Sequence, residues 1–260
     1  MNNSIRSTLR YYIDVLFVLI YKEWIVKYKG TLLGYVWSIA HPLVLSIVFY
    51  IAFKIALKIP IENYTLFLIT GLFAWQWFMN SVMVSVWSFV ANASIIKKTT
   101  FPKFLLPLSI NILDMIHFII SIPVIIVFLA IYHQKVFYFS WFYEIPLVLF
   151  LQLILGFSVG LIFGTLNVFV RDIDRLASLL LTLVMYLTPI FYKIQMVPQE
   201  YRSYFYLNPM VHVIDLWRDI FMRGTINSFN LIWGSIDILI FLAISIAIYK
   251  KLHYKFAEYL

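Results

Sequence analysis

Two acidic residues and one histidine interrupt apolar stretches that are otherwise uncharged. Asp114 and His117 lie three residues apart, so on a helix they share a face and can pair, while Asp237 stands alone in the last apolar stretch. As a proton relay these groups would support an ion-coupled transporter; as a structural pair and a polar seam between helices they need no transport chemistry, and we favour the structural interpretation. No metal site is predicted, because no metal-ligand spacing links the other histidines: His41, His133, His212 and His253.

Asp172 and Asp174 form a D-x-D pattern of the kind that metal-dependent glycosyltransferases use to hold a nucleotide sugar. Two carboxylates can supply oxygen ligands to Mg²⁺. Arg171 and Arg175 are their sequence neighbours and can pair with them instead, which favours ion pairs over a metal. A membrane-embedded glycosyltransferase or acyltransferase nevertheless stays open as an alternative. It would require Asp172, Asp174 or the Asp114–His117 pair to be catalytic, and otherwise we predict no catalytic residue.

The sequence has no G-x-x-x-x-G-K-[ST] loop with which to cradle ATP phosphates. Any ATP must therefore be hydrolysed on a separate subunit, so this chain is expected to bind no cofactor, with ATP and Mg²⁺ held by that partner. Coupling to such a subunit requires short, rigid loops, and two candidates are residues 97–103 and residues 171–175. The alternative is that both are solvated loops that only obey the positive-inside rule. The predicted coupling residues are Lys97, Lys98, Phe101, Pro102, Lys103, Arg171, Asp172, Asp174 and Arg175.

Aromatic residues make up 19% of the chain. Part of this excess is the belt of Trp and Tyr expected at a membrane interface. Flat aromatic faces also pack against the apolar faces of sugar rings, and tyrosine hydroxyls can bond sugar hydroxyls. A polysaccharide path would use such a surface, although helix packing and lipid anchoring are equally good explanations. The candidate path residues are Trp75, Trp77, Phe78, Trp87, Tyr192 and Tyr206.

The elements that position these residues follow from the composition. The chain has 260 residues, of which 63% are hydrophobic and 12% charged, and the mean hydropathy is +0.91. A soluble domain is about half apolar and about a quarter charged, so we predict one all-α integral membrane domain. The net charge of +8 does not indicate nucleic acid, because the basic residues stand at the ends of apolar runs rather than in one patch. The absence of cysteine excludes disulfides and thiol chemistry.

Six stretches are long and apolar enough, or nearly so, to cross a bilayer core as a helix of ~20 residues. The distribution of Lys and Arg favours both termini on the cytoplasmic side of the inner (plasma) membrane, and we see no removable signal peptide. We divide the chain into residues 1–29, a cytoplasmic segment; 30–250, the transmembrane domain; and 251–260, a cytoplasmic tail. The six stretches are Gly30 to Phe53, Asn63 to Ile96, Phe104 to Tyr132, Ile145 to Val170, Leu176 to Tyr192 and Thr225 to Tyr249.

Three segments depart from simple spans. The second stretch would be ~51 Å long as a straight helix at ~1.5 Å per residue, so it must tilt, project into the cytoplasm, or begin with a non-spanning turn near Gly71. Phe191 to Phe221 is interrupted by prolines and is interpreted as a re-entrant or interfacial hairpin on the outer face. Tyr11 to Tyr28 has an apolar core too short to span, which predicts an amphipathic helix on the cytoplasmic surface, with an extension of the first span as the alternative.

Four motifs in order make the chain resemble the permease subunits of polysaccharide ABC exporters, the ABC-2 family that moves O-antigen, capsule or teichoic-acid polymers. Lys27-Tyr-Lys-Gly-Thr-Leu-Leu-Gly34-Tyr-Val-Trp37, followed by His41-Pro42-Leu43, is similar to the basic–aromatic entry into the first span. Gly71-Leu-Phe-Ala-Trp75-Gln-Trp-Phe78 resembles the G-x-x-x-W-x-F-F segment, with Trp77 where Phe is usual. Asn167-Val-Phe-Val-Arg171-Asp172 resembles N-x-x-x-R-D. Thr188-Pro189-Ile190 with Asn208-Pro209 resembles the T-P-I and N-P pair that flanks the outer re-entrant helices.

The resemblance implies a homodimeric pore joined to two copies of a nucleotide-binding subunit, with a lipid-linked glycan entering from the cytoplasm. It implies that the two loops couple to the ATPase and that the N-terminal helix lies at the interface. Lys22, Lys27 and Lys29 are candidates to attract the pyrophosphate of the lipid carrier, since cationic clusters at the inner surface favour phosphate. Membrane lipids are further partners, and nucleic acid is not expected. An ABC-2 drug or lipid exporter shares the architecture and remains open.

Overall fold

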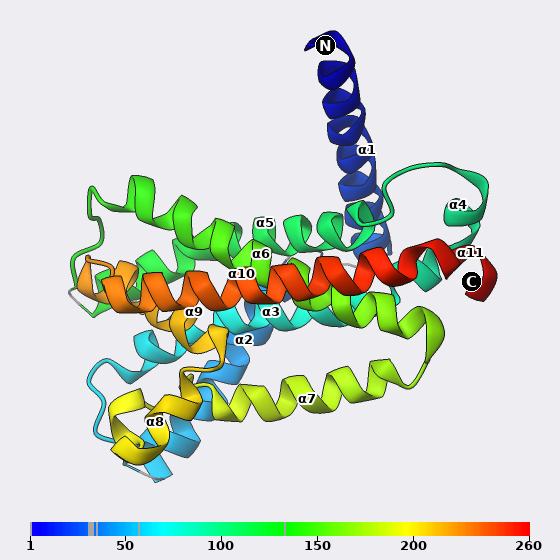
Figure 1. Cartoon of the computed structure of the whole chain (residues 1–260). Helices are drawn as coiled ribbons and strands as arrows, with labels where there is room; N and C mark the ends of the chain where they lie inside the picture. The colour runs from blue at the N-terminus through cyan, green and yellow to red at the C-terminus, as the bar shows by residue number, and fades with distance from the viewer. Residues whose placement is uncertain (1, 31–33, 35, 57, 133) are drawn as a thin grey trace.

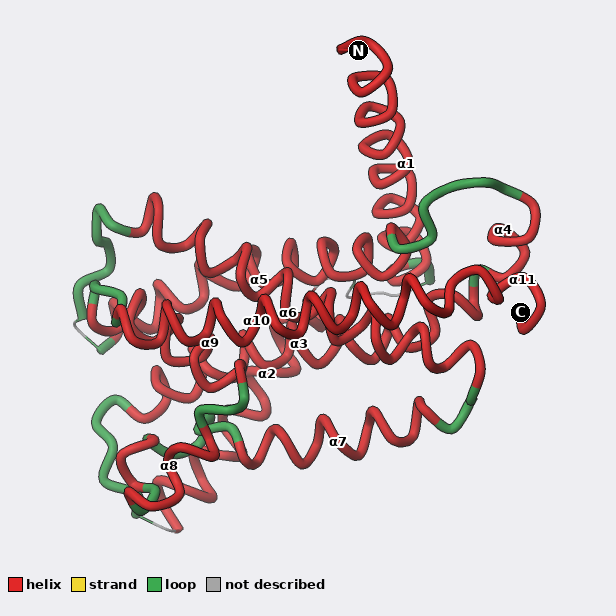
Figure 2. The backbone as a smooth tube through the Cα atoms, viewed as in Figure 1, coloured by secondary structure: helices red, strands yellow, loops and turns green. Residues whose placement is uncertain are grey.

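The computed structural model describes residues 2–30, 34, 36–56, 58–132 and 134–260, and within these ranges every regular element is a helix. Figures 1 and 2 show long helices running side by side, joined by short loops, so the predicted all-α class is confirmed. Thr31, Leu32, Leu33 and Tyr35 of the first-span entry motif, and His133, lie outside the described residues. The elements are α1 (Asn2–Tyr28), α2 (Val36–Phe49), the π-helix η1 (Tyr50–Ala56), α3 (Tyr64–Ala91), α4 (Ala93–Lys98), α5 (Leu105–Ile131), α6 (Trp141–Phe169), α7 (Ile173–Leu187), η2 (Ile194–Met196), α8 (Gln199–Phe205), α9 (Pro209–Arg218), the π-helix η3 (Asp219–Arg223), α10 (Ser228–Leu252), η4 (His253–Lys255) and α11 (Phe256–Tyr259).

Helix α3 forms the centre of the bundle. It packs against α2, α5, α6, α7 and α9, and most of its side chains are buried. Its sequence is apolar all round, which is the pattern of a helix enclosed by others. Two glycines of α6 allow a close approach: a Cβ on Gly160 would lie 2.7 Å from the Ser85 Cβ, and one on Gly164 would lie 2.6 Å from the Ser85 carbonyl oxygen. Small residues at such contacts are typical of membrane helix packing.

Five helices in the described part of the chain are long and apolar enough to cross a membrane. Helix α7 corresponds to the fifth predicted stretch but has only 15 residues, about 22 Å at 1.5 Å per residue. It ends at Leu187, two residues before Pro189, because a proline disfavours helical geometry in the residue that precedes it, here Thr188. The five helices are Ile39–Ala56, Tyr64–Ala91, Leu105–Ile131, Trp141–Phe169 and Ser228–Tyr259.

The over-long second stretch is divided at Asn92. Helix α3 ends at Ala91, and α4 continues separately from Ala93 to Lys98. The alternative of a non-spanning turn near Gly71 is wrong, because Gly71 lies inside α3. The glycine leaves space for Arg218 and forms no turn: a Cβ at Gly71 would make a tight contact of 3.1 Å with Nη2 of Arg218.

The two non-spanning regions lie at different places around the bundle. Helix α1 begins at Asn2, earlier than predicted, and points away from the bundle across the direction of its long helices (Figure 1). Residues 191–221 fold into two short helices, α8 and α9, of 7 and 10 residues, with η2 and η3 beside them. Each of these two helices is shorter than a bilayer crossing requires.

Candidate coupling surface and substrate site

The two predicted coupling loops lie at the same end of the bundle as α4 and α11, which we call the α4 end (Figure 1). Lys97 and Lys98 are exposed in the last turn of α4, and Arg171 and Asp172 are exposed in the turn between α6 and α7. Within the described residues, none of these four forms an ion pair. Exposed charges without internal partners are free to contact another subunit.

The remaining coupling candidates are more constrained. Asp174, in the first turn of α7, accepts a hydrogen bond of 2.9 Å from the indole Nε1 of Trp87 on α3. Arg175 is exposed, whereas Phe101, Pro102 and Lys103 are half-buried before α5. The Asp174 bond joins the first turn of α7 to the central helix α3.

A partly buried ionic cluster joins the end of α1 to α5 and α3. Lys27 Nζ lies 2.7 Å from Asp114 Oδ1 and 3.2 Å from His117 Nδ1. The other carboxylate oxygen, Asp114 Oδ2, accepts a 3.1 Å hydrogen bond from Ser81, and Tyr28 bonds the second ring nitrogen of His117. The predicted pairing of Asp114 with His117 is confirmed at 3.4 Å, with both side chains buried. Lys27 makes the shortest of these contacts with Asp114, and it lies on α1, 87 residues earlier in the sequence.

The other lysines proposed for pyrophosphate binding lie along the same helix. Lys22 Nζ contacts Glu23 Oε1 at 2.8 Å and Asn92 Oδ1 at 2.6 Å, which fixes α1 to the break after α3. Lys29 is exposed just beyond the end of α1. A phosphate group would therefore meet Lys29 freely but would compete with existing partners at Lys22 and Lys27.

Lys27 lines two cavities beside the ionic cluster. One, of about 320 Å³, is bordered by residues of α1, α2 and α3, including Trp37, His41, Gln76 and Asn80. The second, of about 240 Å³, lies between α1, α3 and α5. In the first cavity His41 Nδ1 lies 3.1 Å from Gln76 Oε1, and Gln76 Nε2 donates to Asn80 Oδ1 at 2.7 Å. An exposed tryptophan beside amides and an imidazole offers both a stacking face and hydrogen-bonding groups to a sugar.

The six aromatic residues predicted for the substrate path fall into two groups, three that are buried in the core and three that lie nearer the surface. Trp75, Trp77 and Phe78 are buried: Trp75 packs 5.5 Å from Phe78, and Trp77 packs 5.3 Å from Phe118. These three side chains fill the core of the bundle, so the packing explanation accounts for them in this conformation. Trp37 was noted only as part of the entry motif, and Gln76 and Asn80 were missed, although their spacing of four places them on one face of a helix.

The other three predicted path residues lie nearer the surface. Trp87 is 40% exposed beside Asp174. Tyr192 and Tyr206 are half-buried around α8, and burial raises the pKa of both phenols. The Tyr192 hydroxyl donates to the carbonyl of Tyr186 at 3.1 Å, and the Tyr206 ring stacks on His212 at 5.3 Å.

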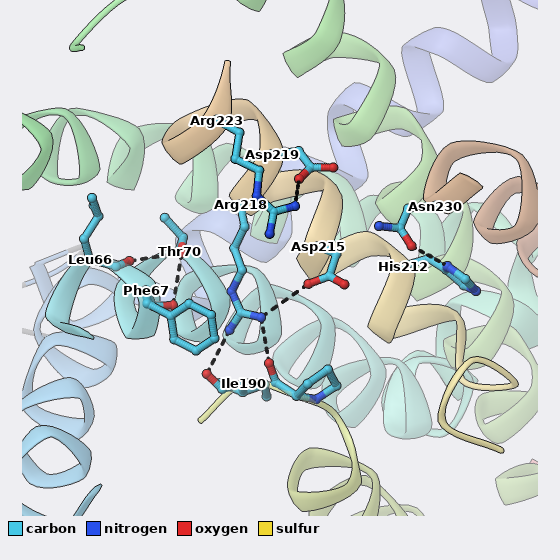
Figure 3. A network of polar contacts seen from close by, with 11 residues as sticks. Leu66, Phe67, Thr70, Ile190, His212, Asp215, Arg218, Asp219, Arg223 and Asn230 are labelled. Atoms are coloured by element: carbon cyan, nitrogen blue, oxygen red, sulfur yellow. Dashed lines mark hydrogen bonds and ion pairs between the residues drawn. The ribbon is translucent and has the colours of Figure 1, made fainter. Parts of the chain in front are cut away.

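A second buried network, missed from the sequence, surrounds Arg218 on α9 (Figure 3). Its guanidinium donates to the carbonyls of Pro189 and Ile190 at 2.7 and 2.9 Å, lies 3.5 Å from Asp215, and covers the Phe67 ring at 3.6 Å. Burial lowers the pKa of Arg218 to about 10, so it remains charged at neutral pH. Arg218 therefore fastens α9 to the chain segment that follows α7.

The predicted hairpin residues meet at the same junction. Asn208 Oδ1 accepts from the Met210 N–H at 3.0 Å, which caps α9, and Pro209 occupies its first position, where a missing N–H costs nothing. The same Asn208 donates from Nδ2 to Thr188 Oγ1 at 2.8 Å. The T-P-I and N-P motifs, 20 residues apart, are thus in direct contact.

Asp237 on α10 lies beside a histidine of α9. Its carboxylate lies 3.7 Å from Nε2 of His212. The Nδ1 atom of His212 lies 3.1 Å from Asn230 Oδ1 (Figure 3). The contact joins α9 to α10, in agreement with a polar seam between helices. Within the described residues no group of three or more His, Asp or Glu side chains could hold a metal ion.

These features define a polytopic helical membrane protein with exposed charges at one end, a polar–aromatic cavity against its central helix and no sequence motif for ATP binding. The model of the ABC-2 type transporter family matches residues 14–222. The chain belongs to this family.

Named relatives support the same family. The chain is 43% identical to the O-antigen export system permease protein RfbA of Klebsiella pneumoniae, over the full length of both chains. It is 29% identical to the protein of the same name from Myxococcus xanthus, over 81% of each chain. It is 24% identical to the polysialic acid transport protein KpsM of Escherichia coli, over 84% of this chain and 85% of the relative. All three are named for transport or export rather than for catalysis.

Proposed function

We propose that this chain is the permease subunit of an ATP-driven exporter that moves a lipid-linked surface polysaccharide of the O-antigen type across the inner membrane. The observation that carries the proposal is the 43% identity, over both full lengths, to an O-antigen export permease. The cavity at Trp37, His41, Gln76 and Asn80 supports it, because its lining matches the chemistry of sugar recognition.

In this proposal α7 is the sixth span beside the five long apolar helices, and both termini are cytoplasmic. The α4 end is then the cytoplasmic end, α1 is the interface helix of a cytoplasmic segment 1–29, and α8 and α9 form the outer re-entrant hairpin of the transmembrane domain 30–250. The excess of Lys and Arg at the α4 end supports this orientation. Residues 251–260 form the cytoplasmic tail.

The pore is a homodimer joined to two copies of an ATPase subunit, which carries the ATP and Mg²⁺. Six helices from one chain are too few to enclose a hydrated glycan, which favours a second copy. The exposed charges Lys97, Lys98, Arg171 and Asp172 contact the ATPase. We expect a double alanine variant of Arg171 and Asp172 to assemble with the ATPase but to lose substrate-stimulated hydrolysis; normal stimulation and export would refute the coupling role.

The lipid pyrophosphate enters beside Lys22, Lys27 and Lys29. Lys29 supplies an exposed charge just beyond the end of α1. Lys27, two residues earlier in the chain, lines both of the cavities described above. Neutralising all three lysines should reduce export strongly, since charge-assisted bonds to phosphate are among the stronger polar contacts. Unchanged export in the triple variant would contradict this entry site.

The overall proposal is tested by deletion and complementation. Cells without the chain should lose surface polysaccharide and accumulate lipid-linked glycan on the cytoplasmic leaflet, and the wild-type chain should reverse both effects. Normal surface glycan combined with lost efflux of a drug or a simple lipid would favour the other type of ABC-2 exporter. Turnover of a nucleotide sugar by the purified chain, without an ATPase, would favour a membrane-embedded glycosyltransferase.

A further inference from the structure

A groove of about 640 Å³ lies at the α4 end of the bundle, where the segment before α5 meets α6 and the end of α10. Its walls are mainly apolar and include Leu108, Phe157, Leu161 and Ile246. Ile246 is 38% exposed, so the groove opens on the outside of the bundle. The volume falls in the range of ~300–1,000 Å³ that is usual for small-molecule sites.

One border of this groove is basic. Lys103 precedes α5, Lys250 lies in the last turn of α10, and His253 follows it, and all three line the groove. Lys103 Nζ lies 5.6 Å from the Phe256 ring, and in the described part of the chain no carboxylate lies within ion-pair distance of Lys103 or Lys250. Among the described residues that line the groove, none is acidic. Its shape and charge therefore fit a ligand with a long apolar part and an anionic head.

The edges of the groove place it at the level of a membrane surface. Tyr12 of α1 lines one edge, and the neighbouring Tyr11 hydroxyl donates to the Thr100 carbonyl at 3.2 Å, so α1 crosses above the loop that forms the basic border. Lysines at the end of an apolar helix extend their amines toward lipid headgroups. Basic pockets between spans on the cytoplasmic side are typical sites for anionic lipid headgroups.

We propose that this groove binds one anionic phospholipid of the cytoplasmic leaflet. Its acyl chain lies against Leu108, Phe157 and Ile246, and its phosphate lies between Lys103 and Lys250. The inference rests on the proposed orientation, in which the α4 end is cytoplasmic. Phe101 and Pro102 of the predicted coupling loop also line the groove, so the bound lipid would pack against that loop and restrict its movement.

Native mass spectrometry of the full chain, purified in detergent and delipidated, tests the charge selectivity. Phosphatidylglycerol and phosphatidylcholine with the same acyl chains are titrated against wild type and a K103Q/K250Q variant. We expect the variant to lose phosphatidylglycerol affinity about twenty-fivefold with phosphatidylcholine unchanged, because each lysine near an anionic lipid contributes about fivefold. The matched control is K135Q/K193Q, which removes two exposed lysines at the opposite end of the bundle. An equal loss in both variants, or no loss in either, overturns the proposal.

The occupant is identified by a photo-crosslinking residue at Ile246 in the full chain in cell membranes. An adduct with the mass of an anionic phospholipid supports the proposal. An adduct with a second copy of the chain or with the ATPase subunit, or no lipid adduct, overturns it. Neither measurement depends on polysaccharide export: selective lipid binding without export contradicts only the proposed function, and export without selective binding contradicts only this inference.

Discussion

Replacing Lys27 by Met removes the positive charge from a carboxylate that is almost completely buried. The Asp114 side chain is 4% exposed and that of Lys27 is 34% exposed, with 2.7 Å between the charged atoms. Removing one partner of a buried pair costs ~3–5 kcal/mol, whereas an exposed pair contributes at most ~1 kcal/mol. Because a third of Lys27 is exposed, we expect a loss of about 2–3 kcal/mol from the attachment of α1 to the bundle.

The expected result is that α1 separates from α5 before the bundle unfolds. The chain contains no cysteine, so spin labels can be placed at two introduced cysteines, F17C on α1 and V127C on α5, both at exposed positions. In the wild-type background the distance distribution between the labels should be narrow, and with Lys27→Met it should broaden. Lys29→Met is the matched control, since Lys29 is exposed and, among the residues that the structure describes, has no carboxylate within ion-pair distance.

A double-mutant cycle isolates the ion pair from the lost packing of the lysine stem. Lys27→Met, Asp114→Asn and the double variant should give a coupling energy of ~1–3 kcal/mol in thermal unfolding. The reasoning is refuted if the coupling is below ~0.3 kcal/mol and the label distances are unchanged, because α1 would then be held by its apolar contacts alone.

Three further predictions concern the core and the cavity. Arg218→Met should cost ~3–5 kcal/mol and expose residues 191–207 to protease, since a buried charged residue and its carbonyl bonds are removed; wild-type resistance to protease would contradict the fastening role. Gln152→Leu should lower the unfolding free energy by ~1–3 kcal/mol in thermal unfolding. The reason is that the Trp217 indole N–H, 2.6 Å from Gln152 Oε1, loses its acceptor. An unchanged midpoint of thermal unfolding would exclude that bond as a stabilising contact. Trp37→Ala should reduce polysaccharide export about tenfold with normal membrane levels of the chain, as expected for a lost stacking face. The control Trp233→Ala, at a similarly exposed position on α10, should leave export unchanged. Equal effects of the two substitutions would rule out a specific sugar contact at Trp37.

The helices were predictable because a bilayer imposes length and apolarity on each span. The stretches that became α3, α5, α6 and α10 are visible in the sequence for this reason. The position of Asn92 as the division between α3 and α4 was not predictable, because nothing in the local pattern distinguishes a long tilted helix from an interrupted one. The end of α7 was visible at Pro189, but its short length left the span count open.

The buried face of a span was much harder to predict. Helix α3 is apolar on all sides, so periodicity does not separate Trp77, which fills the core, from Trp87, which reaches the surface. Nothing in the local sequence distinguishes Arg218, which lies near Asp215 and Asp219, from a solvated basic residue. Its burial depends on carbonyls that the turn after Thr188 presents, and that geometry exists only in the folded chain.

Helix α3 contacts both polar networks, the one around Asp114 and the one around Arg218. It also lines the polar–aromatic cavity. Ser81 of α3 bonds Asp114, which holds Lys27 of α1, while Gly71 of α3 lies against Arg218, which holds α9. Gln76 lies between these two positions on α3 and lines the polar–aromatic cavity, and Lys27 lines the same cavity from the other side. Lys27 on α1 and Gln76 on α3 thus line one cavity, so its shape depends on how α1 packs against α3, while Arg218 joins α9 to Pro189 and Ile190 beyond the other side of Gln76.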